Sequence, residues 1–86
     1  KSIFYKSSDG LDVIFPKKSK TFKTIQSDGD YLVQNIITDN NILSYSIELN
    51  GQKINTPFKL EKYDLAKFVI ERSSPAIESK IILQTN

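Results

Sequence analysis

The feature that most restricts the fold is a regular alternation of apolar and polar residues near the middle of the chain. In the segment 42–49, Leu43, Tyr45, Ile47 and Leu49 alternate with two serines and a glutamate. Side chains alternate between the two faces of a strand, so this period of two places every apolar side chain on one face and the Ser/Ser/Glu face in water. The preceding segment, Tyr31–Thr38, is apolar on both faces, which is typical of a strand in the interior of a sheet that is covered on each side.

These two segments are predicted to pair as a hairpin. Asp39, Asn40 and Asn41 separate them, and Asn tolerates the left-handed backbone of a tight turn. An Asn40-Asn41 turn places Ile36 opposite Tyr45 and Leu32 opposite Leu49, whereas a slip by one residue pairs Ile37 with Leu43 and Val33 with Ile47. Both registers bring apolar residues together, and the sequence leaves the choice open.

Turn residues divide the rest of the chain into further short strands. The segment beginning at Ile3, Phe4 and Tyr5 is expected to form a hairpin with 11–15 through Ser8-Asp9-Gly10, and Pro16 ends the second strand. A third strand, Thr21–Gln26, ends at Ser27-Asp28-Gly29. Asn50-Gly51 is the strongest short hairpin signal and predicts that 52–55 returns antiparallel. Thr56-Pro57 breaks that strand or moves the chain to the other sheet. Ser79–Gln84 is a final strand.

The segment 58–72 fits two structures. As a helix, it places Leu65, Phe68, Val69 and Arg72 on one stripe, with Asp64 as a possible N-cap and Ser73-Ser74-Pro75 as the stop. As strands, 58–60 and 67–71 alternate and are separated by 61–64. The strand interpretation is favoured because the helix would be short and successive Phe, Val and Ile prefer a pleated surface. The predicted fold is therefore all-β, an antiparallel β-sandwich of seven to eight short strands. The alternative is an α+β domain with one short helix around 62–72.

Composition restricts the functions that such a domain can have. The 86 residues suit a single small domain, 1–86, and contain neither Cys nor His. Disulfides and thiolate chemistry are excluded, and the commonest zinc ligands and catalytic groups are missing. Glu71 and Glu78 are close in sequence, but nothing marks them as a buried catalytic pair. We therefore expect no enzymatic activity, no cofactor and no metal.

Several aspartates fall near predicted turns and raise the question of calcium. Asp28, Asp30 and Asp39 flank one strand, while Asp9 and Asp12 flank another turn. Calcium needs six to eight oxygen ligands, and no spacing here matches an EF-hand loop. Aspartate also favours turns by bonding to nearby backbone, and this interpretation is preferred.

The concentrated charge feature is a lysine cluster around an aromatic residue, which is the candidate binding site. It consists of Lys17, Lys18, Lys20, Phe22 and Lys23. Lysines beside an aromatic ring suit single-stranded nucleic acid, because they contact phosphates while the ring stacks on a base. The alternative interpretation is that the lysines protect an edge strand from pairing with other molecules and Phe22 points into the core. The alternation of residues and the modest net charge of +2 favour this alternative.

One part of the chain resembles a known family of domains. The run Asn50-Gly51, 56–60, Asp64 and 67–71 resembles bacterial immunoglobulin-like and fibronectin-III-like surface modules, although Tyr63 stands where those modules often have Gly. Gly29-Asp30-Tyr31 resembles the start of a tyrosine-corner strand, in which the hydroxyl bonds to an upstream backbone group. The absence of Trp and of a Cys pair excludes an antibody-type core.

The strand pattern and the missing catalytic residue types lead to one preferred functional hypothesis. The chain is expected to be a non-catalytic structural or binding module (spacer, adhesion, or protein or glycan interaction) of a larger surface or virion-type protein. Its partners would be other protein domains or a surface ligand, outside the cell or on a cell or virion surface. Because it begins at Lys1 and contains no Met, we expect it to be cut from or processed out of a longer protein. No apolar run is long enough to predict membrane insertion. The alternative hypothesis is a small β-barrel that binds single-stranded nucleic acid through the lysine cluster. Nucleic acid is the less favoured partner.

Overall fold

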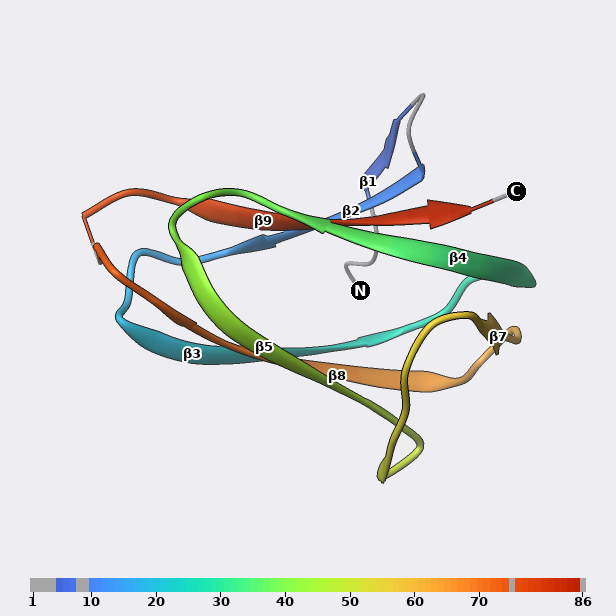
Figure 1. Ribbon diagram of the computed structural model, residues 1–86. Coiled ribbons are helices and arrows are strands. Elements are labelled where there is room, and N and C mark those ends of the chain that lie inside the picture. The colour runs from blue at the N-terminus through green and yellow to red at the C-terminus, as the bar shows by residue number, and fades with distance from the viewer. Residues whose placement is uncertain (1–4, 8–9, 75, 86) are drawn as a thin grey trace.

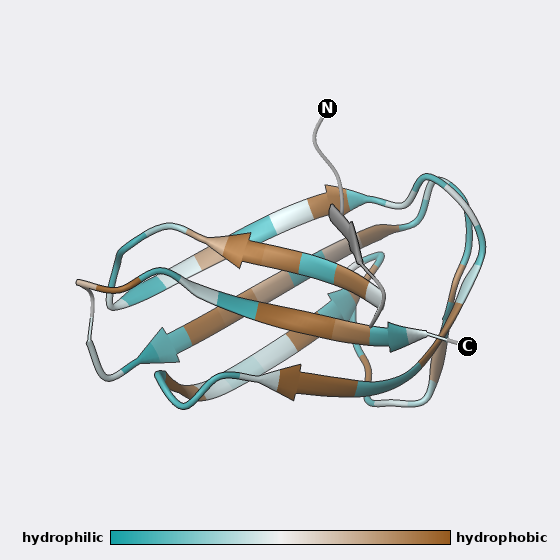
Figure 2. Ribbon diagram, turned by 90° about the horizontal axis from the view of Figure 1, so that it is seen from above, coloured by the Kyte–Doolittle hydropathy of each residue, from teal (hydrophilic) through white to brown (hydrophobic). Residues whose placement is uncertain are grey.

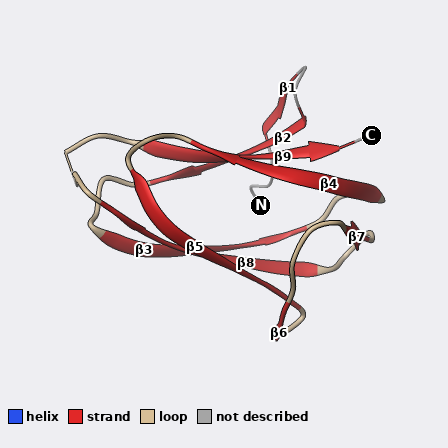
Figure 3. Ribbon diagram, viewed as in Figure 1, coloured by secondary structure: helices blue, strands red, loops and turns tan. Residues whose placement is uncertain are grey.

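The chain folds as two layers of β-strands (Figure 1). The computed structural model describes residues 5–7, 10–74 and 76–85. Within them the strands are β1 (Tyr5–Ser7), β2 (Gly10–Phe15), β3 (Lys20–Gln26), β4 (Tyr31–Thr38), β5 (Ile42–Leu49), β6 (Gln52–Lys53), β7 (Phe58–Leu60), β8 (Leu65–Arg72) and β9 (Ser79–Thr85). The described residues contain no helix, and therefore none that could cross a membrane (Figure 3).

The two layers are antiparallel sheets that pack face to face. One sheet has the order β1-β2-β9-β4-β7 and the other the order β3-β8-β5-β6. The predicted β-sandwich is confirmed, with more strands than the seven or eight expected. The favoured strand interpretation of 58–72 is confirmed, and the alternative of a helix around 62–72 is wrong, because β8 pairs with β3 on one side and with β5 on the other. Its Ala66, Phe68 and Ile70 are buried at every second position, which is the period of a strand and not of a helix.

The core lies between the two sheets and is built from alternate residues of the strands. Figure 2 shows apolar residues along the strands of both sheets. The most deeply buried apolar side chains are Leu11, Val13, Phe15, Ile25, Val33, Ile47, Leu60, Ala66, Phe68, Ile70, Ile81 and Leu83. The predicted hairpin of β1 and β2 is confirmed, although Ile3 and Phe4 of the expected first strand and Ser8 and Asp9 of its turn lie outside the described residues. The strand Ser79–Gln84 is also confirmed, as β9.

The predicted hairpin of β4 and β5 is wrong. β4 pairs with β9 and β7, while β5 pairs with β8 and β6 in the other sheet. The connection through Asp39, Asn40 and Asn41 therefore crosses from one layer to the other, and neither proposed register exists. β4 and β5 do not pair with each other because an arch between the sheets lets each strand turn one apolar face toward the same core. Their pairing partners are instead β9 and β8, which come from the C-terminal part of the chain.

The predicted central position of β4 is confirmed, since β9 and β7 flank it. The expectation that both its faces are covered is wrong, because Leu32 and Ile37 are 42% and 38% exposed. In β5, Ser44 faces water as expected, but Leu43 is 68% exposed. A register shift between Ile42 and Ser44 explains this, because the extra residue leaves the regular ladder and Ile42 packs against the core in its place.

The turn predictions around Asn50-Gly51 are confirmed. Asn50 and Gly51 both have positive φ, 51° and 89°, as a type I′ hairpin turn requires. β6 returns antiparallel to β5, and after the cis Thr56-Pro57 bond the chain enters the other sheet as β7. Tyr63, at the position where the resembling modules often have Gly, has φ of 76°. The backbone there is in the left-handed region that Gly adopts readily.

Candidate functional site on the edge strand β3

The residues of the predicted lysine cluster lie in and just before β3, but they face different directions. Lys17 and Lys18 are exposed in the link from β2 to β3, and Lys20 is exposed at the first position of β3. Phe22 is on the outer face of the sheet and Lys23 is on the inner face. β3 is the first strand in the order of its sheet, so the interpretation of this segment as an edge strand is confirmed.

The expectation that Phe22 points into the core is wrong. Its side chain is 63% exposed, and Ile25, three residues later, is the core residue of β3. Side chains alternate along a strand, so burying Ile25 places Phe22 outside. The ring is not isolated, because Nζ of Lys67 lies 5.0 Å from its centroid, within the range of a cation–π contact.

Lys23 points inward from an edge strand. Its Nζ donates a hydrogen bond of 3.0 Å to the carbonyl oxygen of Ile14, which belongs to β2 of the opposite sheet. The aliphatic part of the side chain can line the gap between the sheets while the ammonium group reaches a polar atom. Inward-pointing lysines are a known protection of sheet edges, because another strand that pairs there must accommodate the charge.

The backbone of β3 alternates between groups that pair with β8 and groups that face outward. The bonds from Arg72 N to Ser19 O (3.0 Å) and from Ser27 N to Asp64 O (2.9 Å) fix which positions pair. Counting in steps of two from either end, the peptide groups of Thr21, Lys23 and Ile25 face β8. Those that face outward, with no neighbouring strand among the described residues, belong to Lys20, Phe22, Thr24 and Gln26.

The outer face beside this edge mixes apolar and oppositely charged groups. Its cross-strand rows are Lys20 with Glu71 and Ser44, Phe22 with Val69 and Ser46, Thr24 with Lys67 and Glu48, and Gln26 with Leu65. Leu65 is 47% exposed. A shallow depression of about 210 Å³ lies on this sheet and is lined by Lys20, Ser44, Tyr45, Ser46, Val69, Ile70 and Glu71. Two glutamates thus balance two lysines on the face, whereas the edge itself is lined by lysines.

Of the aspartates considered for calcium, Asp30 and Asp39 accept hydrogen bonds from backbone N–H groups in turns. Oδ1 of Asp30 accepts from Lys62 N at 3.0 Å, and Oδ1 of Asp39 accepts from Asn41 N at 3.0 Å. Asp12 forms an ion pair with Lys80 at 3.5 Å. The described residues contain no group of three or more carboxylates placed to hold a metal ion. Asp9 lies outside them.

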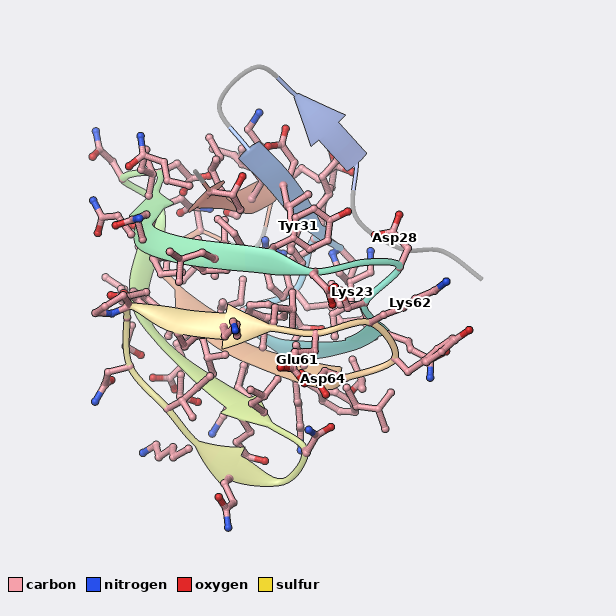
Figure 4. All side chains as sticks on the ribbon, turned by 90° about the vertical axis from the view of Figure 1, so that its right-hand side faces the viewer. Lys23, Asp28, Tyr31, Glu61, Lys62 and Asp64 are labelled. Atoms are coloured by element: carbon pink, nitrogen blue, oxygen red, sulfur yellow. The ribbon has the colours of Figure 1, made fainter. Side chains whose placement is uncertain are left out.

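The structure also shows where Tyr31 and the two glutamates Glu71 and Glu78 lie. The Tyr31 hydroxyl donates to Oδ1 of Asp28 at 2.6 Å, so this bond joins it to a side chain (Figure 4). Glu71 is on the outer face of β8, with Oε1 3.5 Å from Ser44 Oγ. Glu78 lies after β8 and lines a different depression, of about 330 Å³, with Ile14, Asp39, Ser79 and Lys80. The two glutamates line different depressions and share no site.

Sequence reasoning missed Lys67 and Leu65, which adjoin Phe22 and Gln26 on the outer face. Their strand was predicted, but the register of β3 against β8 joins residues that are 39 to 51 positions apart in the sequence. No local signal reports that register.

Comparison of the chain with models of protein families, with curated proteins and with solved structures gave no match.

Proposed function

We propose that this chain is a non-catalytic interaction module of a larger surface or virion-type protein, and that it binds another protein through β3. The observation that carries the proposal is Phe22, a large aromatic side chain that is 63% exposed on an edge strand. Aromatic residues are enriched at the energetic centres of protein interfaces. The neighbouring Lys67 and Leu65 add a charged and an apolar contact on the same face.

The charge distribution supports a protein partner over nucleic acid. A polyanion that lay across the outer face would meet Glu71 beside Lys20 and Glu48 beside Lys67. Lys23 already donates to the Ile14 carbonyl on the inner face, so it does not present its charge beside Phe22. Single-stranded nucleic acid binding instead relies on a continuous basic groove with aromatic stacking platforms.

The experiment is a selection of binding peptides from a random phage-displayed library on the immobilised protein. Selected peptides are then synthesised, and their affinities are measured for the wild-type chain, for Phe22→Ser and for Ile77→Ser. Ile77 is a matched control, because it is 57% exposed and lies outside β3. An oligothymidylate and a set of glycans are titrated in parallel.

We expect enriched peptides whose affinity falls about tenfold in Phe22→Ser and stays unchanged in Ile77→Ser. The proposal is contradicted if no peptide is enriched, or if the two variants bind the peptides equally well. Binding of oligothymidylate that weakens steeply with salt, without peptide binding, would favour the nucleic-acid hypothesis.

A further inference from the structure

We infer that the edge of β3 accepts an extended acidic segment of a partner protein as an added antiparallel strand. This inference rests on the proposed function and specifies its partner and its mode of binding. The four peptide groups that face outward, those of Lys20, Phe22, Thr24 and Gln26, present N–H donors and C=O acceptors in alternation. A second peptide backbone satisfies both kinds of group, which is the basis of strand addition to a sheet edge. A phosphate backbone offers acceptors only and leaves the carbonyls unpaired.

The chemistry of the partner follows from the charges along the edge. Lys17 and Lys18 precede the strand, Lys20 begins it, and Lys23 lies on its inner side. Among the described residues, none of these four lysines lies within ion-pair distance of a carboxylate. Lys80, by contrast, forms an ion pair with Asp12. An incoming strand with Asp or Glu at alternate positions would place carboxylates near the ammonium groups of Lys17, Lys18 and Lys20, whereas Lys23 already donates to the Ile14 carbonyl on the inner face. Cross-strand pairs of opposite charge stabilise a sheet, and like charges directly opposite destabilise it.

The same lysines disfavour a second copy of this chain as the occupant. The antiparallel register that uses all four outward-facing residues pairs Phe22 with Thr24 and Lys20 with Gln26 of the second copy. The midpoint of that register is residue 23, so the two Lys23 side chains would lie opposite each other on the inner side. An acidic partner removes this repulsion, and the edge can therefore discriminate between partners by charge.

The experiment titrates the protein with a blocked peptide, as long as β3, in which Glu alternates with Thr. Its matched control carries Lys in place of every Glu. Amide hydrogen exchange is followed by NMR. Bound peptide should slow exchange at Phe22 and Thr24, whose N–H groups face outward. The exchange rates of the Lys23 and Ile25 amides should not change, because these N–H groups already pair with β8. The Lys peptide should produce no such protection.

Thr24→Pro is the decisive variant. It removes an outward N–H and places a ring in the path of the incoming strand, while the bonds to β8 stay intact. We expect at least about a tenfold loss of affinity for the Glu peptide in Thr24→Pro, and a loss below about twofold in Thr24→Ala, which keeps the N–H. Changing Lys17, Lys18 and Lys20 to Glu should abolish the preference for the acidic peptide, whereas the same change at Lys53 and Lys59 should not.

The outcomes separate this inference from the proposed function. Equal binding of the Glu and Lys peptides, or equal binding by Thr24→Pro and Thr24→Ala, overturns the inference. So does slowed exchange confined to residues outside β3. If the Glu peptide fails but library-selected peptides bind and depend on Phe22, the proposed function stands and strand addition is wrong. If Thr24→Pro does not fold, the exchange pattern of the wild-type protein with the two peptides decides the question.

Discussion

Asn50 and Asp64 are joined side chain to side chain across two turns at one end of the sandwich, with Asn50 Nδ2 donating to Asp64 Oδ1 at 3.2 Å. Asn50 Oδ1 also accepts from Leu65 N at 2.9 Å, and Asp64 Oδ2 accepts from Glu61 N at 2.8 Å. The backbone carbonyl of Asp64 receives the N–H of Ser27 from the turn after β3. The pair therefore links the ends of β3, β5 and β8, and it holds the register on which the alternation of the β3 edge depends.

Asn50→Ala is expected to lower the free energy of unfolding by about 2 kcal/mol. About 1 kcal/mol comes from a left-handed backbone that Ala tolerates poorly, and the rest from the lost side-chain hydrogen bonds. Asn50→Gly keeps the backbone conformation and should lose only about 1 kcal/mol. Urea denaturation measures both. Equal losses in the two variants would show that the positive φ of 51° at Asn50 does not contribute.

Asn41 has the corresponding role at the opposite end. Its Nδ2 donates to Ser74 O (3.0 Å) and to Ser79 Oγ (3.1 Å), and its Oδ1 accepts from Ser73 Oγ and Ser74 N, each at 2.9 Å. Asn41→Ala should therefore destabilise the fold by about 2–3 kcal/mol, because Ser79 is buried and loses a partner. Asn40→Ala, at the exposed neighbouring position, is the control and should change stability by less than about 0.5 kcal/mol. A thermal-shift and denaturant series compares them, and a neutral Asn41→Ala would contradict this assignment.

Arg72 is expected to reduce the stability of the fold. Its side chain is 4% exposed and donates through Nη2 to the carbonyl of Pro16. Nε and Nη1 are buried without a hydrogen-bond partner among the described residues. Burying a charge without full compensation is costly, so Arg72→Met should stabilise the protein by about 1 kcal/mol. Arg72→Ala should be the less stable of the two, because it also leaves a cavity. A loss of stability in Arg72→Met, measured by urea denaturation, would refute the prediction.

Lys23→Val should promote self-association. The variant removes the inward-pointing charge from the edge and leaves an apolar side chain that favours strand pairing. Sedimentation velocity over a concentration series should detect dimers or larger species in Lys23→Val. The control Lys62→Val also removes one positive charge, from the turn between β7 and β8, and should keep the oligomeric state of the wild-type protein. Identical sedimentation of both variants would mean that Lys23 does not guard the edge.

The sequence was sufficient to predict strands wherever alternation coincided with burial. β2 and β8 show this clearly, because Leu11, Val13 and Phe15, and then Ala66, Phe68 and Ile70, lie at every second position and are buried. The pairing of β4 with β5 could not be read in the same way. A short polar turn fits a hairpin within one sheet as well as an arch between two sheets. The choice is decided by β8 and β9, which follow much later in the chain.

The candidate site was predicted only in part, because its composition is local but the contacts that orient its side chains come from distant strands. The lysine cluster and the edge position of its strand were evident from composition and alternation. The direction of Phe22 depended on whether Phe22 or Ile25 occupies the core, and both residues are apolar. The opposite sheet decides this, because Ile14 offers a carbonyl to Lys23 on the inner side and so fixes which face of β3 turns inward. Lys67 becomes a neighbour of Phe22 only through the β3–β8 register.

The most direct test of the account is amide hydrogen exchange along β3 in the free protein. We expect an alternating pattern, with slow exchange at Thr21, Lys23 and Ile25, which pair with β8, and fast exchange at Phe22, Thr24 and Gln26, which face outward. Uniformly slow exchange would show that the edge is covered and unavailable to a partner. Uniformly fast exchange would show that β3 does not pair with β8, and the proposed binding edge would not exist.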